Sequence, residues 1–233
     1  GGPAGLVAAK SLLEEGHKPV LFERTDRIGG IWAQRAAPPW GTYRSTRLQS
    51  SKYTALFSDF PAPEAMDLFP GVAAMDGYFN DYADRFDLRP TIRLRAPVTD
   101  LRPEGGAWRL RHRDERAEHD EPFDAIALCP GLFWDPRMPA VPGRESFRGR
   151  VLHSTGYAEP SPFAGQRVLV VGNGVSGLDI AAELCGVAAQ VSLAVRRPQW
   201  VIPRMNGFVP NDCALSPLRR MEMQGQSRDE TLA

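Results

Sequence analysis

Two glycine-rich segments carry the residue types and spacing that best suit ligand chemistry. In the second of them, glycines recur as Gly172-x-Gly174-x-x-Gly177 between an apolar run at 166–171 and an alanine-rich run at 178–185. Glycine has no Cβ, so the backbone can turn sharply, approach a pyrophosphate and direct helix N–H groups at its charge. The pattern predicts a dinucleotide-binding turn. The predicted contacts are Gly172, Asn173, Gly174, Val175, Ser176 and Gly177.

The first glycine-rich segment matches only the later positions of the same fingerprint. These positions are Gly1, Gly2, Pro3, Ala4 and Gly5. We expect the first glycine and the strand before it to lie upstream, so that Gly1 is a cut inside a motif. Glu23, about 20 residues further on at the end of an apolar run, is placed to accept hydrogen bonds from ribose hydroxyls. The alternative is a solvated acid at the end of a strand.

The charges that follow the two turns indicate different nucleotides. Glu23 would repel a 2′-phosphate, which favours FAD or NAD, whereas Arg196 and Arg197 would neutralise one, which favours NADP. Arg204 is a further candidate for the same role. Two alternatives remain open. The arginines could be solvated surface residues that bind no nucleotide, and the second turn could pack a helix onto a sheet without binding a ligand.

The elements that must position these residues can be read from the apolar pattern. A strand at 166–171, a helix at 178–185 and a strand at 190–196 form a βαβ unit, which implies a parallel sheet. The first segment repeats the order with a helix at 4–15, stopped by Gly16, and a strand at 19–23. Further segments are a surface excursion at 35–63, a helix at 75–86, strands at 108–112 and 123–128, and a proline-rich linker at 130–143.

This order predicts an α/β protein with two Rossmann-like dinucleotide-binding domains, both incomplete. We expect the first dinucleotide-binding domain at 1–143, a linker at 144–165 and a partial second one at 166–233.

Composition excludes several classes of protein. The 28 basic and 28 acidic residues give no net charge, which argues against a nucleic-acid partner. No apolar run approaches the roughly 20 residues of a membrane span, and no signal peptide is evident, so we expect a cytoplasmic protein. Cys129, Cys185 and Cys213 are too few and too scattered for a disulfide framework or a zinc site, and we expect no metal.

A third motif narrows the prediction to a family. The run Phe147-x-Gly149-x-x-x-His153-x-x-x-Tyr157 resembles the signature of the flavin-containing monooxygenases, two-dinucleotide-binding flavoproteins, and lies just before the second turn, as in that family. Further family-like segments are Gly29-Gly30-Ile31-Trp32, Ser51-Lys52, Phe57-Ser58-Asp59-Phe60-Pro61 and Cys129-Pro130-Gly131. The resemblance extends as far as Arg204, and it implies that the domain at 1–143 is an FAD-binding domain and that the domain at 166–233 is an NADP-binding domain.

The resemblance implies a reaction and a set of contacts. NADPH would reduce FAD, and reduced flavin with O2 would give a C4a-hydroperoxide that passes one oxygen atom to an amine nitrogen or a sulfide sulfur of a small molecule. The implied FAD contacts are Gly1, Gly2, Pro3, Ala4, Gly5, Glu23, Arg24, Gly30, Ile31, Trp32 and Val98. Gln49 stands where the family often has an asparagine near flavin and nicotinamide. We assign no catalytic acid or base, because the flavin carries the chemistry; His153 is expected to serve as a hinge or to position NADP.

Three alternatives remain. A Baeyer–Villiger oxygenase would have tryptophan at the position of Tyr157. A flavin disulfide reductase would need a close cysteine pair, which the sequence lacks. The chain as written could also be an inactive nucleotide-binding fragment, because the family completes its FAD domain with a segment after the NADP domain. Without that segment and a first strand, we expect the isolated chain to be poorly soluble or partly unfolded.

Overall fold

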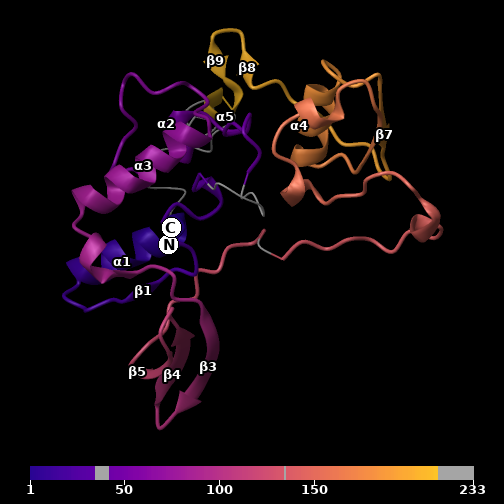
Figure 1. The fold of residues 1–233 in the computed structure, drawn as a ribbon. Helices are drawn as coiled ribbons and strands as arrows, with labels where there is room; N and C mark the ends of the chain where they lie inside the picture. The colour runs from indigo at the N-terminus through magenta and orange to yellow at the C-terminus, as the bar shows by residue number, and fades with distance from the viewer. Residues whose placement is uncertain (35–41, 134, 215–233) are drawn as a thin grey trace. The chain divides into compact units, whose positions relative to one another are not determined.

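The computed structural model describes residues 1–34, 42–133 and 135–214 (Figure 1). The chain divides into a first unit, Gly1–Thr42 with Val72–Gly149, and a second unit, Tyr43–Gly71 with Arg150–Ala233. The expected domain limits are defined by the cofactor that each domain would bind, so they stay a prediction. Within the described ranges, no helix combines the length and apolarity needed to cross a bilayer.

The first unit contains two α-helices, α1 and α3, and two small sheets. In chain order its elements are α1 (Pro3–Glu14), β1 (Leu21–Phe22), η1 (Gly30–Trp32), α3 (Val72–Arg85), η2 (Arg89–Thr91), β2 (Ile92–Arg93), β3 (Val98–Glu104), β4 (Ala107–Arg113), β5 (Glu118–Phe123) and η3 (Arg144–Ser146). The letter η marks a 3₁₀ helix.

Both helices predicted for this unit are confirmed. The buried side chains of α3 recur every three or four residues, as expected for one face of a helix: Met75, Tyr78, Phe79, Tyr82 and Ala83. The α1 helix buries Leu6 and Ala9 and ends before Gly16, whose positive φ of 79° suits glycine. Lys10 of α1 lies over the ring of Phe86, the residue after α3, 5.0 Å from its centre.

The predicted strand at 19–23 is only two residues long. Leu21 and Phe22 of β1 pair in parallel with Ile92 and Arg93 of β2. The partner strand is short because a 3₁₀ turn precedes it and Arg95, with φ of 53°, follows it in a left-handed conformation that a strand cannot continue through.

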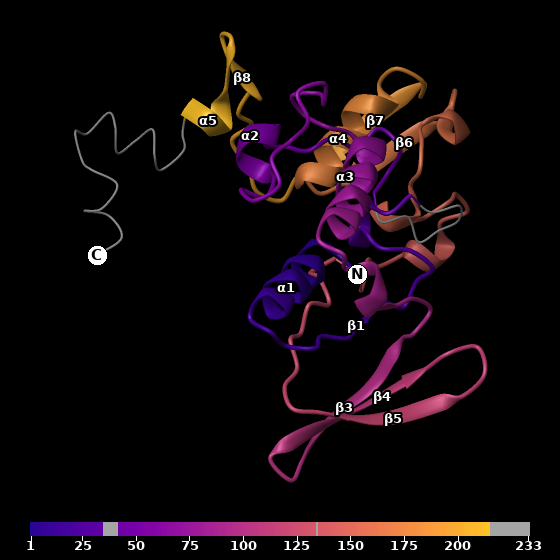
Figure 2. The ribbon, with the colours of Figure 1, turned by 90° about the vertical axis from the view of Figure 1, so that its left-hand side faces the viewer.

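An antiparallel sheet of β3, β4 and β5 extends from this pair (Figures 1 and 2). The alternation predicted at 108–112 falls inside β4, where Leu110 and His112 are buried. The strand predicted at 123–128 is wrong beyond Phe123, which ends β5. Within the described residues, no neighbouring strand pairs with 124–128, and Leu128 is 72% exposed. Residues 130–133 and 135–143 form neither helix nor strand and lie within the first unit, so the role of this segment as a linker stays a prediction.

The second unit contains the predicted βαβ order. Its elements are α2 (Lys52–Ala55), η4 (Ser154–Gly156), η5 (Ser161–Phe163), β6 (Arg167–Val171), α4 (Val175–Leu184), β7 (Gln190–Ala194), β8 (Met205–Asn206), β9 (Val209–Pro210) and α5 (Asn211–Ala214). β6 and β7 are parallel, with Val168 opposite Val191 and Val170 opposite Leu193. Val168 and Val170 of β6 pack with Ile180 and Leu184 of α4, so the strand buries one face against the helix.

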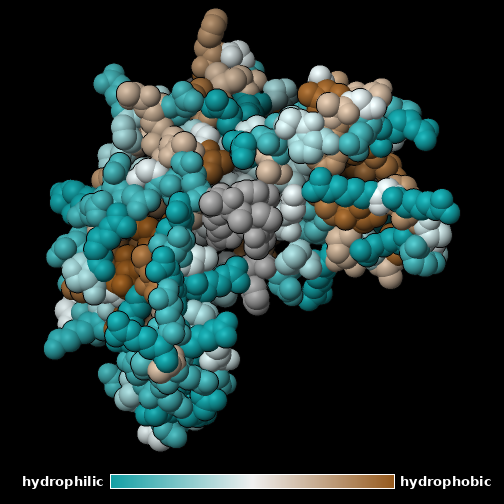
Figure 3. Space-filling view, in the orientation of Figure 1, coloured by the Kyte–Doolittle hydropathy of each residue, from teal (hydrophilic) through white to brown (hydrophobic). Residues whose placement is uncertain are grey.

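The other face of this sheet is open in the described structure. Side chains alternate along a strand, so Leu169 and Val171 point away from α4, and they are 62% and 69% exposed. Figure 3 shows hydrophobic residues at the surface beside α4 and β7.

Of the surface excursion predicted at 35–63, residues 35–41 lie outside the described residues, and 43–63 belong to the second unit, whose segment Tyr43–Gly71 is fixed by polar contacts. The Ser51 N–H and hydroxyl donate to Oδ2 of Asp212, at 2.9 and 2.7 Å, which ties α2 to α5. The Lys52 ammonium donates to three backbone carbonyls, those of Pro63, Glu64 and Met66, at 3.3, 2.8 and 2.7 Å. The family-like Ser51-Lys52 pair therefore fixes this segment.

Candidate dinucleotide-binding sites

The first glycine-rich turn opens directly into α1. Gly2 is the N-cap, no side chain caps the helix, and the first intrahelical bond runs from the Leu6 N–H to the Gly2 carbonyl at 3.0 Å. The N–H groups of Ala4 and Gly5 lie in the first turn, where no intrahelical carbonyl can accept from them. Together with the positive end of the helix dipole, they make an anion-binding geometry.

The glycines of the Gly29–Trp32 segment approach this turn closely. The Gly29 N–H donates to the Gly1 carbonyl at 2.8 Å. A Cβ added to Gly30 would lie 2.9 Å from the Cα of Gly2, and Gly30 has φ of 60°. The structure thus brings Gly1, Gly2 and Gly30 together, with Ile31 and Trp32 following in η1.

Glu23 lies at the same turn. One of its carboxylate oxygens is 2.9 Å from the Gly1 nitrogen, and the other accepts from the N–H and the hydroxyl of Thr25, at 2.8 Å each. Burial raises the pKa of this carboxyl, and the hydrogen bonds from Thr25 lower it. The group is an oriented carboxylate at neutral pH. Thr25 was missed in the sequence, although a threonine two residues after an acid can form this local turn.

Two expected FAD contacts are less closely placed. Arg24 is exposed beyond Glu23. Val98 begins β3 opposite His112 and is 41% exposed. Both assignments stay predictions.

The second turn is shaped by its own backbone. Gly172 has φ of 103°, and its N–H donates to the Ala194 carbonyl of β7 at 2.9 Å. A Cβ added to Gly177 would lie 2.2 Å from the Gly172 carbonyl oxygen, so only glycine lets α4 begin this close to the turn. Gly174 is the N-cap of α4 without a side-chain cap, and Val175 and Ser176 are exposed at the start of the helix. The first-turn N–H groups are therefore available to an anion.

One amide connects this turn to the arginines. The Asn173 side chain donates from Nδ2 to the backbone carbonyl of Arg197 at 2.8 Å. The Arg196 and Arg197 side chains are exposed, and no carboxylate of the described residues forms an ion pair with either. Arg204, the further candidate, lies over the ring of Phe69, 5.6 Å from its centre.

The four positions of the signature motif are split between the two units. In the first unit, a Cβ at Gly149 would meet the Phe147 ring at 2.4 Å, so the ring folds over this glycine. In the second unit, Nδ1 of His153 accepts from the Thr155 N–H at 3.2 Å and caps η4. This contact agrees with a hinge role for His153, which stays a prediction.

Tyr157 anchors the end of the motif to α4. It is 2% exposed, and its hydroxyl donates to Glu183 at 2.7 Å. Burial, followed by the Glu183 carboxylate, raises the pKa of this phenol well above its ordinary value. Tyr157 therefore remains a neutral donor inside a core that includes Phe163 and Ile180.

Gln49 is bonded to the same helix. Its Nε2 donates to Oδ2 of Asp179 at 3.1 Å, and the Tyr43 hydroxyl donates to the same oxygen at 2.7 Å. The expected contact of Gln49 with flavin or nicotinamide stays a prediction. Asp179 and Glu183 were missed, although two acids four residues apart on an alanine-rich helix share one face and mark it for polar contacts.

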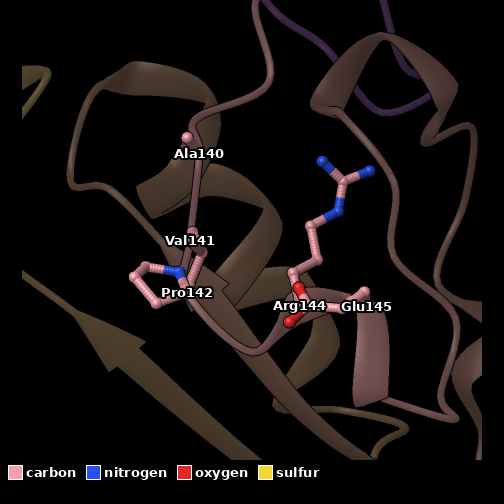
Figure 4. A pocket seen from close by; sticks show the side chains of 5 residues that line it. All are labelled: Ala140, Val141, Pro142, Arg144 and Glu145. Carbon is pink, nitrogen blue, oxygen red and sulfur yellow. The ribbon is translucent and has the colours of Figure 1, made fainter.

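The structure has a surface hollow of about 550 Å³ whose lining residues belong to neither glycine-rich turn (Figure 4). It is lined by Ala140, Val141, Pro142, Arg144 and Glu145. In Figure 4 the Arg144 guanidinium is directed away from the Pro142 ring, and none of the expected site residues lines the hollow.

Comparison with known proteins decides the family. The model of the flavin-binding monooxygenase-like family matches residues 1–224. The chain belongs to the flavin-binding monooxygenase-like family. The resemblance of the sequence to flavin-containing monooxygenases is thereby confirmed.

Individual members of this family are similar over much of the chain. Mouse dimethylaniline monooxygenase [N-oxide-forming] 2 is 38% identical over 215 residues, which is 88% of this chain and 40% of the relative. The chain thus spans about two fifths of the length of such relatives. The S-allyl-L-cysteine S-oxygenase of Allium sativum superposes with a TM-score of 0.78 at 28% identity, covering 90% of this chain and 52% of the other. The structure of OTEMO in complex with FAD and NADP gives a TM-score of 0.70 at 25% identity, covering 96% and 42%. The predicted α/β Rossmann-like class is confirmed.

Proposed function

We propose that this protein is an NADPH- and FAD-dependent monooxygenase that transfers one oxygen atom from O2 to an amine nitrogen or a sulfide sulfur. The observation that carries the proposal is the pair of glycine-rich turns, one beside a carboxylate and the other beside two exposed arginines. Membership of the flavin-binding monooxygenase-like family supports it. We also propose a cytoplasmic location.

The residues of the first turn fit FAD. The Ala4 and Gly5 N–H groups would bind the pyrophosphate, and the approach of Gly30 to Gly2 leaves backbone, without side chains, at the place where phosphates pack. Glu23 would accept hydrogen bonds from the adenosine ribose.

The residues of the second turn fit NADPH. The first-turn N–H groups of α4 would bind the pyrophosphate, and Arg196 and Arg197 would pair with the 2′-phosphate. The Asn173 bond to the Arg197 carbonyl holds the arginine segment beside the turn, which supports selection of NADPH over NADH.

The substrate class rests on relatives and on one residue. One relative is named as N-oxide-forming and one neighbour as an S-oxygenase, so soft nucleophiles are substrates within the similar set. Tyr157 stands where Baeyer–Villiger enzymes have tryptophan, and its hydroxyl is bonded to Glu183, a contact that suits tyrosine.

Bound flavin would supply the redox and oxygen chemistry, while the chain binds, orients and excludes water. His153 does not serve as a proton donor at Nδ1 here, because that atom accepts the Thr155 N–H. We assign no side chain as a general acid or base.

The test uses the protein expressed from its complete reading frame. We expect flavin absorbance in the purified protein and NADPH oxidation stimulated by a tertiary amine or a dialkyl sulfide, with N-oxide or S-oxide as product. Lactone formation from a cyclic ketone, without N- or S-oxide, would favour the Baeyer–Villiger alternative. A protein that binds neither FAD nor NADPH would contradict the proposal.

A further inference from the structure

A carboxyl group of α3 lies against the loop at 28–33, which carries Gly29 and Gly30. A Cβ added to Gly29 would lie 3.3 Å from Oδ1 of Asp76, so this oxygen faces the Cα of the glycine. Gly29 is the N-cap of η1 with φ of 109°, and α3 packs on η1. The loop therefore meets a polar group of a helix that is distant in the sequence.

Both backbone polar groups of Gln34, the residue after this loop, are hydrogen-bonded. The Gln34 N–H donates to the carboxyl of Asp76. The guanidinium of Arg27, the residue before the loop, donates to the Gln34 carbonyl oxygen. We call Arg27, Gln34 and Asp76 the loop clamp, because together they close the base of the loop and fasten it to α3.

The carboxyl of Asp76 is a costly group if its role is packing alone. Its Oδ1 is buried and has no hydrogen-bond partner among the described residues. Burial raises the pKa of Asp76, while the bond from Gln34 and the charge of Arg27 act in the opposite direction. A buried oxygen without a donor costs stability, so an apolar side chain would suit packing at least as well. What the carboxyl adds is the bond that holds Gln34.

The clamped loop is the segment that approaches the first turn. The Gly29 N–H donates to the Gly1 carbonyl at 2.8 Å, and a Cβ on Gly30 would lie 2.9 Å from the Cα of Gly2. These contacts join backbone to backbone, so the contacts that hold the loop from α3 help to set the separation of the two segments. Releasing Gln34 from Asp76 would let Gly29 and Gly30 shift relative to the first-turn N–H groups.

We propose that Asp76 is a positioning residue for the first turn and that, through Gln34, it holds Gly29 and Gly30 at the separation that the FAD pyrophosphate requires. The inference rests on the proposed binding of FAD at this turn. Asp76 acts as a hydrogen-bond acceptor for the loop, so an uncharged acceptor of the same shape can replace it, whereas an apolar side chain cannot.

The first experiment measures the dissociation constant of FAD in the complete protein. Asp76→Leu accepts no hydrogen bond and should raise this constant about tenfold, as expected for the loss of one bond to a carboxylate. Asp76→Asn keeps a carbonyl acceptor for Gln34 and should restore most of the affinity. Asp81→Leu, at an exposed position of the same helix, is the matched control and should bind FAD as the wild type does. The affinity for NADPH should not change in any of the three variants.

Hydrogen exchange of the FAD-free protein gives a second measurement that needs no cofactor. Asp76→Leu should speed amide exchange in the peptide at 27–34, which contains the Gly29 N–H, while the amides at 78–85 of α3 keep their wild-type rates. Asp76→Asn and Asp81→Leu should leave the exchange of both peptides unchanged.

Three results would overturn the inference. They are wild-type exchange at 27–34 in Asp76→Leu, faster exchange along the whole of α3 in that variant, and a loss of FAD affinity in Asp76→Asn as large as in Asp76→Leu. A wild type that binds no FAD would instead refute the proposed function, and the exchange at 27–34 would still decide whether Asp76 holds the loop.

Discussion

The two glycine-rich turns solve the same geometric problem with different partners. At the first turn, close backbone approach occurs between two segments far apart in sequence, Gly2 and Gly30, and the adjoining side chain is an acid. At the second turn, the approach is local, between Gly172 and Gly177, and an asparagine ties the turn to a pair of arginines. The comparison teaches that one fingerprint can be built with opposite charges while the helix termini present the same N–H groups.

The largest expected effect on cofactor affinity comes from adding a side chain to a glycine of one turn while the other turn is left unchanged. Gly177→Ala would place a Cβ against the Gly172 carbonyl, and the overpacking should weaken NADPH binding by about 10- to 100-fold. FAD content should not change. Titration of each cofactor in the complete protein checks both statements.

Gly30→Ala is the converse change, since its Cβ would meet Gly2 and its φ is positive. It should lower FAD occupancy while NADPH still binds. Gly77→Ala, a helix position with open space around it, is the control and should leave both affinities unchanged. Equal loss of both cofactors in either turn variant would show that the turns do not act independently.

The next effect concerns the acid at the first turn. Glu23→Ala removes a charged acceptor for ribose hydroxyls and should weaken FAD binding by roughly 10-fold or more. Glu23→Gln keeps one carbonyl acceptor for the Thr25 donors and should lose less. Fluorescence titration of the apoprotein with FAD measures both, and an unchanged affinity in Glu23→Ala would remove this residue from the site.

The arginines distinguish the second turn from the first. The double change Arg196→Ser, Arg197→Ser should raise the KM for NADPH about 10-fold and leave that for NADH nearly unchanged, because only the 2′-phosphate loses its partners. Steady-state oxidation of the two nucleotides supplies the comparison. A parallel increase for both would assign the arginines to another part of the cofactor.

The smallest effect is structural. Tyr157→Phe deletes the bond to Glu183 and should lower the free energy of unfolding by about 1 kcal/mol, without altering the ratio of the two cofactor affinities. Denaturant unfolding of the complete protein measures it. A changed cofactor ratio would give Tyr157 a role at the second turn beyond packing.

Local patterns predicted the parts of the fold that local sequence determines. The run from β6 to β7 was predictable because its strands, turn and helix each carry their own periodicity. The strand expected at 124–128 failed because alternation marks two faces but does not supply a hydrogen-bonded neighbour. Contacts between distant segments, such as Gly2 with Gly30 and Tyr43 with Asp179, have no local signature, so the sequence could name the glycines but not pair them.

The carbonyl contacts of Lys52 have a chemical consequence. The chain has three lysines, Lys10, Lys18 and Lys52. Lys18 is exposed and Lys10 pairs with Glu14 at 2.9 Å, whereas the protons of the Lys52 amine are held by three backbone oxygens. The Lys52 nitrogen can attack an acylating reagent only after the hydrogen bonds to the carbonyls of the segment 63–66 break. The rate of labelling at Lys52 relative to Lys18 should therefore report how often this segment opens.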